Sequence, residues 1–334
     1  MTGGGTVSSP ERLHVDSPFH RGEREVQTRV GVRDKIQSIG ERVIRDFMPE
    51  QHREFFGQLP FIIIGTVDAA GSPWASMLTG TPGFISSPDP RSLRIDARLL
   101  PGDPLAHTLN AGVDVGLLGI DLHTRRRNRV NGPIVNKDAR DFTLQVAQSF
   151  GNCPKYINKR RYELIAHEHR TTLAPRVLEQ LDSATAGQIQ NADTFFIATH
   201  STETCPRRSH GADVSHRGGK PGFVHIDDER ILTWPDYVGN FLFNTLGNLM
   251  LNPRAGLLFP DFATGDMLYL SGRGEVIWDG DEVRAFAGAQ RLVRFHIERL
   301  VQLSAALPMR WRFEEYSPFL EPASRDGAGI SAGA

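Results

Sequence analysis

The clearest pattern in the chain is an alternation of apolar and polar side chains over residues 292–303. Val293, Phe295 and Ile297 fall on one face of an extended backbone, whereas Arg294 and His296 fall on the other. The pattern predicts a strand with one buried face. Shorter apolar runs between turn residues predict further strands at residues 61–67, 74–78, 93–97, 113–120, 127–131, 194–199, 210–217, 222–226, 231–234, 255–259 and 267–277.

Helical spacing of apolar residues appears in other parts of the chain. Ile36, Ile39 and Val43 share one face of a predicted helix that begins near residue 32. Asp103 followed by Pro104 is typical of a helix start, because Asp caps free amides and Pro suits the first turn. Further helices are predicted at residues 142–150, 173–181, 240–250 and 281–289.

Two parts of the chain repeat each other. Residues 79–84, Thr-Gly-Thr-Pro-Gly-Phe, return as Gly-Gly-Lys-Pro-Gly-Phe at residues 218–223, 139 positions later. Further matches lie at offsets from 134, as for Phe61 and Phe195, to 140, as for Gly116 and Gly256. We therefore predict two copies of one strand-rich unit, whose mutual interface would suit a large planar ligand.

These elements predict a mainly β fold with helices (α+β), built from two barrel-like units in tandem. No predicted strand is followed by Gly-x-Gly-x-x-Gly at the start of a helix, so a Rossmann domain is not expected. We expect an N-terminal extension with helices at 1–56, a first barrel at 57–137, a helical connector at 138–191, a second barrel at 192–322 and a flexible tail at 323–334.

Composition narrows the function classes. Hydrophobic residues make up 39% of the 334, charged residues 23%, and the net charge is -1, so nothing favours a nucleic-acid or membrane partner. We found neither a long apolar stretch nor a secretory signal, and we expect a cytoplasmic protein. Only Cys153 and Cys205 are present, so redox chemistry would need a bound organic cofactor.

Three stretches of the second repeat resemble a known family. They are residues 210–223 (His-Gly-Ala-Asp-Val-Ser-His-Arg-Gly-Gly-Lys-Pro-Gly-Phe), 231–240 (Ile-Leu-Thr-Trp-Pro-Asp-Tyr-Val-Gly-Asn) and 244–259. Together they resemble the pyridoxamine 5'-phosphate oxidase-like, FMN-binding split-barrel family. The Ser-Phe-Gly-Asn-Cys-Pro run at 149–154 is similar to that of its long, tandem members. The resemblance implies two tandem split β-barrels with FMN between them.

The resemblance also implies which residues bind the cofactor. The sequence departs from that of true pyridoxamine phosphate oxidases, which have Ser-Arg-Lys where this chain has Val238-Gly239-Asn240. The phosphate would instead use amide groups at a helix N-terminus, Arg217 and Lys220. The implied cofactor-binding residues are Ser215, His216, Arg217, Lys220, Thr233, Trp234, Asn240, Asn244 and Thr245.

Several features permit more than one interpretation. His210 and His216 share a strand face, but without a third ligand we do not predict a metal site. The basic run at 125–129 is either a solvated hairpin or a grip on an anion, and we favour a structural or substrate-pocket role for Cys153 over a nucleophilic one. Trp74 and Met77 belong either to the core or to the far wall of the flavin pocket.

The sequence thus predicts an FMN-dependent oxidoreductase acting on a small-molecule electron donor or acceptor, with one FMN held mainly by the C-terminal half. Pairing of two chains stays open. The alternatives are a flavin-nucleotide-binding protein without turnover, and a haem-binding or deazaflavin-binding version of the same barrel.

Overall fold

The computed structural model describes residues 17–165, 174–201 and 209–320. The flexible tail predicted at 323–334 and Cys205 lie outside them, as do parts of the N-terminal extension at 1–56, the connector at 138–191, the predicted helix at 173–181 and the second barrel at 192–322. The helices are α1 Arg21–Arg29, α2 Arg33–Val43, α3 Glu50–Gly57, α4 Ser183–Asn191, α5 Asn244–Leu251 and α6 Asp281–Ala285, with a 3-10 turn at Pro318–Leu320.

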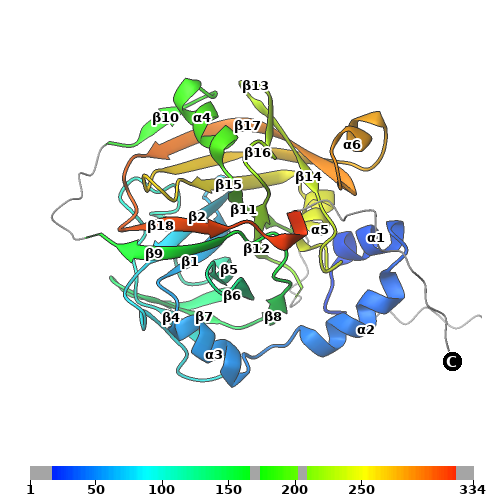
Figure 1. The fold of residues 1–334 in the computed structure, drawn as a ribbon. Helices are drawn as coiled ribbons and strands as arrows, with labels where there is room; N and C mark the ends of the chain where they lie inside the picture. Colours follow the sequence, from blue (N-terminus) through cyan, green and yellow to red (C-terminus); the bar gives the residue numbers. More distant parts are fainter. Residues whose placement is uncertain (1–16, 166–173, 202–208, 321–334) are drawn as a thin grey trace, which may run out of the picture.

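Two eight-stranded antiparallel sheets form the molecule (Figure 1), which confirms the predicted fold class. A separate two-stranded ribbon pairs β9 Lys159–Leu164 with β18 Met309–Glu315. The first sheet holds β1 Phe61–Val67, β2 Pro73–Thr79, β3 Ile85–Ser86, β4 Ser92–Ile95, β5 Asp114–Asp121, β6 Arg126–Lys137, β7 Phe142–Gln145 and β8 Gln148–Asn152. The second holds β10 Arg176–Leu178, β11 Thr194–His200, β12 Ala212–Gly218, β13 His225–Asp228, β14 Ile231–Asp236, β15 Arg254–Pro260, β16 Met267–Ile277 and β17 Arg291–Leu303.

The internal repeat is a repeat of topology. The first sheet runs β2-β1-β5-β6-β7-β4-β3 and the second runs β12-β11-β15-β16-β17-β14-β13, so each strand on these paths has a counterpart in the same place. Off the paths, β8 pairs with β6 and β10 pairs with β17. The register corrects one detail. Gly65 pairs with Gly116, and Ala198 pairs with Gly256, so β1 and β11 correspond at an offset of 133 and not 134. A one-residue slip matters on a strand because it exchanges the two faces.

The two sheets meet along a seam where backbones touch. A Cβ on Gly116 would lie 2.7 Å from the Cα of Asp213, and a Cβ on Gly256 would lie 2.6 Å from the Cα of Trp74. These contacts are equivalent, since Trp74 and Asp213 are 139 positions apart, the offset that relates β2 to β12. The repeats are therefore related by an internal pseudo-two-fold, and one apolar core cluster spans both.

The predicted helical connector is wrong over residues 142–152, which form β7 and β8. Arg129 of β6 pairs with Phe150, as Tyr269 of β16 pairs with Val301, so β7 and β8 together are the first-repeat counterpart of β17. Apolar residues at 142, 146 and 150 fit a helix, but Phe142 and Leu144 also alternate with polar neighbours, and sheet pairing decides the outcome.

Two other predicted helices also differ. In the described part of the connector, Val177 and Leu178 lie in β10, which pairs with β17, and only α4 is helical. Residues 103–110 form turns because the Asp103 carboxylate is buried, where it accepts hydrogen bonds from the Ser76 and Tyr269 hydroxyls.

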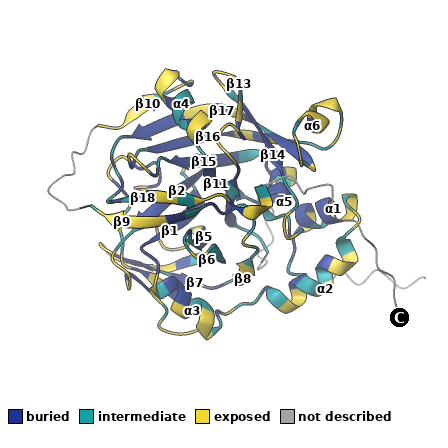
Figure 2. Cartoon of the chain, in the orientation of Figure 1, coloured by how far each residue is buried: buried dark blue, intermediate teal, exposed yellow. Residues whose placement is uncertain are grey.

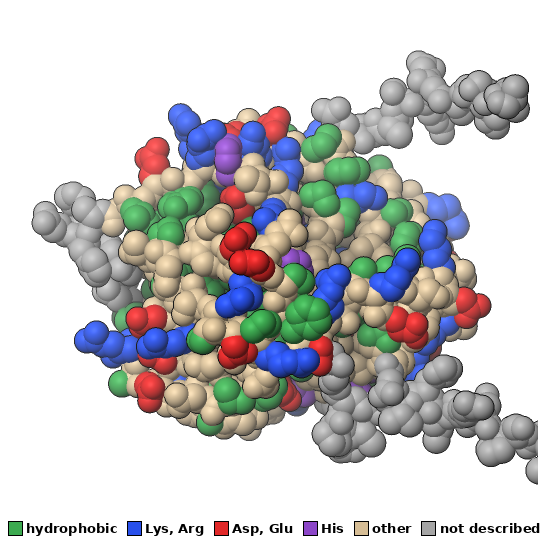
Figure 3. Space-filling model, turned by 90° about the horizontal axis from the view of Figure 1, so that it is seen from below, with side chains coloured by type: hydrophobic (Ala, Val, Ile, Leu, Met, Phe, Trp, Pro, Cys, Tyr) green, Lys and Arg blue, Asp and Glu red, His purple; other side chains and the backbone are tan. Residues whose placement is uncertain are grey.

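The helices cover the outside of the sheets, and their buried faces turn inward (Figure 2). Helix α1 packs on α5 at a close crossing, where a Cβ on Gly22 would lie 2.1 Å from the carbonyl oxygen of Gly247. Seen from below, basic, acidic and apolar side chains are interspersed over the surface (Figure 3). Within the described ranges, none of the helices has the length and apolar character needed to span a bilayer.

We expect Gly256→Ala to lower the free energy of unfolding by about 1–3 kcal/mol, because the new methyl group would overlap the backbone of the other repeat. The matched control is Gly187→Ala in α4, where a Cβ meets nothing within 4 Å and alanine should stabilise the helix by up to about 1 kcal/mol. Urea unfolding of both variants measures the two effects. Equal stability of both variants would show that the seam backbones are not in contact.

Candidate functional site

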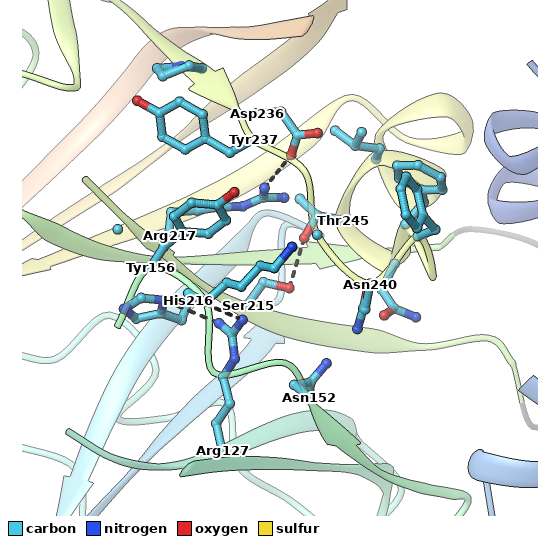
Figure 4. Close-up of a pocket in the computed structure, with 18 of the residues that line it drawn as sticks. Arg127, Asn152, Tyr156, Ser215, His216, Arg217, Asp236, Tyr237, Asn240 and Thr245 are labelled. Carbon is cyan, nitrogen blue, oxygen red and sulfur yellow. Dashed lines mark hydrogen bonds and ion pairs between the residues drawn. The ribbon is translucent and has the colours of Figure 1, made fainter. Parts of the chain in front are cut away.

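A cavity of about 830 Å³, including its open mouth, lies at the seam and is lined by both repeats (Figure 4). We call it the seam cavity. The second repeat supplies the end of β12, the loop after β14 and the N-terminus of α5, and the first supplies β6 and the segment after β8. Its lining residues include Arg127, Arg129, Asn152, Lys155, Tyr156, Ser215, His216, Arg217, Asp236, Tyr237, Asn240, Asn244 and Thr245.

The buried Arg129 side chain of the first repeat bonds to three residues of the second. Its Nε lies 3.1 Å from the Asp213 carboxylate, and its two terminal nitrogens donate to Ser215 Oγ at 2.6 Å and to Asn244 Oδ1 at 2.8 Å. Ser215 also accepts a hydrogen bond from the Thr245 hydroxyl at 2.9 Å. A strand of the first repeat thus fixes β12 and the first turn of α5 in the second.

Arg127 lies two residues before Arg129 on β6. Its side chain faces the cavity and is less buried than that of Arg129. Its Nε donates to the Cys153 carbonyl at 2.7 Å, and a terminal nitrogen lies 3.2 Å from Nδ1 of His216. Burial, followed by repulsion from Arg129, lowers the pKa of Arg127 to about 9. The side chain is therefore still cationic at neutral pH and adds positive potential to the cavity.

His216 is held neutral. Burial first, and then the charges of Arg127 and Arg217, lower the pKa of His216 well below its usual value. Because Nδ1 faces an arginine donor, Nδ1 is the acceptor of the neutral ring and Nε2 carries the proton. Nε2 is buried without a hydrogen-bond partner among the described residues. It is a donor available to a ligand.

Arg217 is anchored at the opposite side of the cavity. One terminal nitrogen is bonded to a carboxylate oxygen of Asp236, whose other oxygen lies 3.2 Å from Arg291 (Figure 4). The Nε of Arg217 is buried and, within the described part of the chain, has no partner. The guanidinium is thus fixed in position while one of its donors stays free.

Backbone strain is concentrated around the cavity. Five non-glycine residues of the described chain have positive φ, and three of them, Tyr156, Phe241 and Phe243, line this cavity. Tyr156 donates a hydrogen bond to the Val238 carbonyl at 3.0 Å, and its ring centroid lies 5.2 Å from that of Tyr237. Strained positions that persist at a cavity are typical of functional sites.

The structure places six of the nine predicted site residues at the cavity: Ser215, His216, Arg217, Asn240, Asn244 and Thr245. The other three do not line it. Lys220 is exposed, with its Nζ 5.7 Å from the Tyr316 ring; Thr233 donates to Asp227 at 2.6 Å; Trp234 is in the core, edge-on to Phe195 at 5.1 Å.

Sequence reasoning did not assign individual residues of the first repeat to the site. Arg127 and Arg129 belong to the basic run that the sequence left open between a solvated hairpin and a grip on an anion, and Asn152, Lys155 and Tyr156 belong to the segment at 149–156. The repeat itself held the signal, because the interface of two like units brings β6 against β12. Cys153 contributes its carbonyl oxygen, which positions Arg127.

The pseudo-two-fold generates a second position along the seam, and there the side chains are apolar. His216, Arg217 and Arg127 correspond to Met77, Leu78 and Met267, which are at most 1% exposed. Their registers in the two sheets are equivalent. Trp74 and Met77 are therefore core residues, and this second position is filled by protein.

The filled position still holds two buried hydroxyl groups and one buried carboxyl group. Ser76 and Tyr269 correspond to Ser215 and Arg129. Both hydroxyls donate to Asp103, Tyr269 at 3.0 Å, and burial raises the pKa of that carboxyl to about 6. One of the two equivalent positions is thus an open cavity, and the other is closed by side chains.

The buried Glu23 carboxyl of α1 contacts Asn244, which lines the seam cavity. Glu23 Oε1 accepts a hydrogen bond from Asn244 Nδ2 at 2.5 Å, and Oε2 accepts one from the His20 amide at 2.9 Å. Burial, with a smaller contribution from Asp213, raises the pKa of Glu23 to about 8. The described residues hold no group of three His, Cys, Asp or Glu side chains placed to bind a metal ion.

No family model and no curated protein matches the sequence. Among solved structures, the chain is similar to a putative pyridoxamine 5'-phosphate oxidase from Lactobacillus delbrueckii, with 16% identity over 37% of this chain and 94% of that chain, and a TM-score of 0.29. It is similar to an FMN-binding protein from Syntrophomonas wolfei (8% identity, 35% and 84%, TM-score 0.25). A FAD-binding protein from Mycobacterium smegmatis matches at 11% identity (41% and 100%, TM-score 0.27). One of these three proteins is thus described as a putative pyridoxamine 5'-phosphate oxidase, one as FMN-binding and one as FAD-binding, and each match covers about one repeat of this chain.

We expect the raised pKa of Glu23 to make the free energy of unfolding fall as pH rises. Its pKa is higher in the folded state, so between about pH 4.5 and 8 the folded chain retains a proton that the unfolded chain has lost. The stabilisation present below pH 4.5 is lost through this window, at up to about 1.4 kcal/mol per pH unit. Urea unfolding at pH 5, 6, 7 and 8 measures the slope.

Glu23→Gln should flatten this slope, whereas Glu25→Gln, at an exposed position of the same helix, should keep it. A Glu23→Gln variant whose stability falls with pH as steeply as the wild type would contradict the raised pKa.

Proposed function

We propose that the seam cavity binds FMN and that the protein uses it as an oxidoreductase acting on a small-molecule electron donor or acceptor. The observation that carries the proposal is the set of free donors on a cationic cavity wall. His216 Nε2 and Arg217 Nε are buried without partners in the described structure, beside Arg127 and the N-terminus of α5. Such an array suits a planar ligand with carbonyl and phosphate acceptors.

The residues present fit an FMN molecule in charge and shape. A phosphate dianion needs convergent donors, and Arg217, Lys155 and Asn240 lie at the cavity with the first amides of α5. The Tyr156 and Tyr237 rings provide a flat, partly apolar wall.

Bound FMN would supply the electron transfer, and the side chains of the chain would set its surroundings. Arg127 and Arg217 hold positive charge at the cavity wall, which favours a ligand that becomes more negative on reduction. Neutral His216 presents an N–H donor without adding charge. Tyr156 fixes the loop after β14 through its hydrogen bond to the Val238 carbonyl.

The alternatives differ in what they need from the same cavity. Haem ligation through His216 would require the lone pair of Nε2, but the arginine donor at Nδ1 favours the tautomer with a proton on Nε2. A binding protein without turnover needs the same contacts as an enzyme. Steady oxidation of NADH or NADPH by the protein with added FMN distinguishes an enzyme from a binding protein without turnover.

We expect Arg217→Ala and Arg127→Ala each to weaken FMN binding by roughly 10-fold to 100-fold, because each removes a charged donor worth about 1.5–3 kcal/mol. Quenching of FMN fluorescence on titration with protein measures the dissociation constant. Arg312→Ala, at an exposed position on β18, is the control with the same change of charge.

Equal FMN affinity in Arg217→Ala, Arg127→Ala and the control would place the flavin elsewhere. Absence of any quenching in the wild-type protein, together with a colourless purified protein, would remove FMN as the ligand.

A further inference from the structure

A second cavity, of about 690 Å³ including its mouth, lies at the start of β11, where Thr194 pairs with Gly218 of β12, and shares no lining residue with the seam cavity. We call it the β18 cavity. It is bounded by α4, the start of β11, the turn after β15, and the ribbon of β9 and β18. Its lining residues include Arg160, Asp193, Thr194, Asp261, Phe262 and Trp311.

Arg160 is a buried guanidinium with one donor group left over. Its side chain is 8% exposed, and one terminal nitrogen donates to Asp193 Oδ2 at 2.6 Å. The other terminal nitrogen, Nη1, is buried and has no hydrogen-bond partner within the described ranges. Buried donors are nearly always satisfied, so this nitrogen needs a water molecule or a ligand in the cavity as its acceptor.

Thr194 provides a second unused polar atom in the same cavity. Its Oγ1 is buried and likewise has no partner among the described residues. At the offset of 133 between β11 and β1, its counterpart is Phe61, which is 2% exposed and packs edge-on against Trp311 at 5.6 Å. The second repeat thus has a hydroxyl group where the first has a ring that fills space.

Aromatic rings form the remaining walls. The Arg160 guanidinium carbon lies 4.5 Å from the centroid of Phe262 and 5.5 Å from that of Phe313. Trp311 meets Phe262 edge-on at 5.1 Å. These rings offer faces and edges to a further flat ring.

The charges at the cavity argue against an anion. Asp193 already neutralises Arg160, and Asp261 adds a second carboxylate, which accepts the Ala263 and Thr264 amides. A bound carboxylate would face two negative groups and one positive group. A neutral acceptor would use the free donor without that repulsion.

We propose that the β18 cavity binds a small, neutral aromatic molecule carrying a carboxamide or ring carbonyl, independently of the seam cavity. The carbonyl oxygen accepts from Arg160 Nη1, the Thr194 hydroxyl bonds the same polar end, and the ring lies among Trp311, Phe262 and Phe313. The site is additional to the FMN site, and its existence does not depend on that assignment.

Benzamide, benzoate and toluene form a probe series of similar shape, and ligand-observed NMR titration of the full-length protein measures their affinities. Benzamide should bind most tightly. Thr194→Val should weaken it at least threefold, and Arg160→Lys, which keeps the charge beside Asp193, should weaken it at least fivefold. Thr28→Val, at an exposed position on α1, should leave it unchanged.

Failure of benzamide to bind, or binding that is the same in Thr194→Val and Arg160→Lys as in the wild type, would overturn the site. Tighter binding of benzoate would overturn the neutral ligand class. Loss of benzamide binding when FMN is added would show that the probe occupies the seam cavity, which would also overturn the proposal. Failure of FMN to bind affects only the proposed function.

Discussion

The constraint on which the structure depends is the direct contact of two backbones at the seam. Gly116 and Gly256 lie against Asp213 and Trp74 of the opposite repeat, at distances that leave no room for a side chain. This contact brings β6 of the first repeat beside β12 of the second. A buried arginine on one repeat can then complete a pocket on the other, and Arg129 does so through three partners.

The pseudo-symmetry of the seam is kept by the order of the strands and broken by the side chains. The two sheets keep the same strand order, yet His216, Arg217 and Arg127 at one position correspond to Met77, Leu78 and Met267 at the other. Apolar side chains close one position and stabilise the core, while charged side chains keep the other open to a ligand. The Asp236 carboxylate offsets the cost of burying Arg217, and the Asp213 carboxylate offsets the cost of burying Arg129.

The repeat and the strands were predictable because they rest on local alternation and on a register held over both halves. Six of the nine residues implied by the resemblance line the seam cavity, whereas Trp234 lies in the core because strand alternation turns it towards Phe195. The repeat predicted an interface between two like units, but not which first-repeat side chains reach it, since contacts such as that of Arg127 with His216 join distant segments. The helix expected at 142–150 failed because its spacing is compatible with both structures and sheet pairing decided between them.

The central claim is that both repeats build one flavin site at the seam while its symmetry mate is closed. A crystal structure of the protein grown with FMN tests this most directly. The account predicts one FMN per chain, in contact with Arg127 of β6 and Arg217 of β12. An FMN bound away from these two arginines, or two FMN molecules related by the internal two-fold, would contradict it.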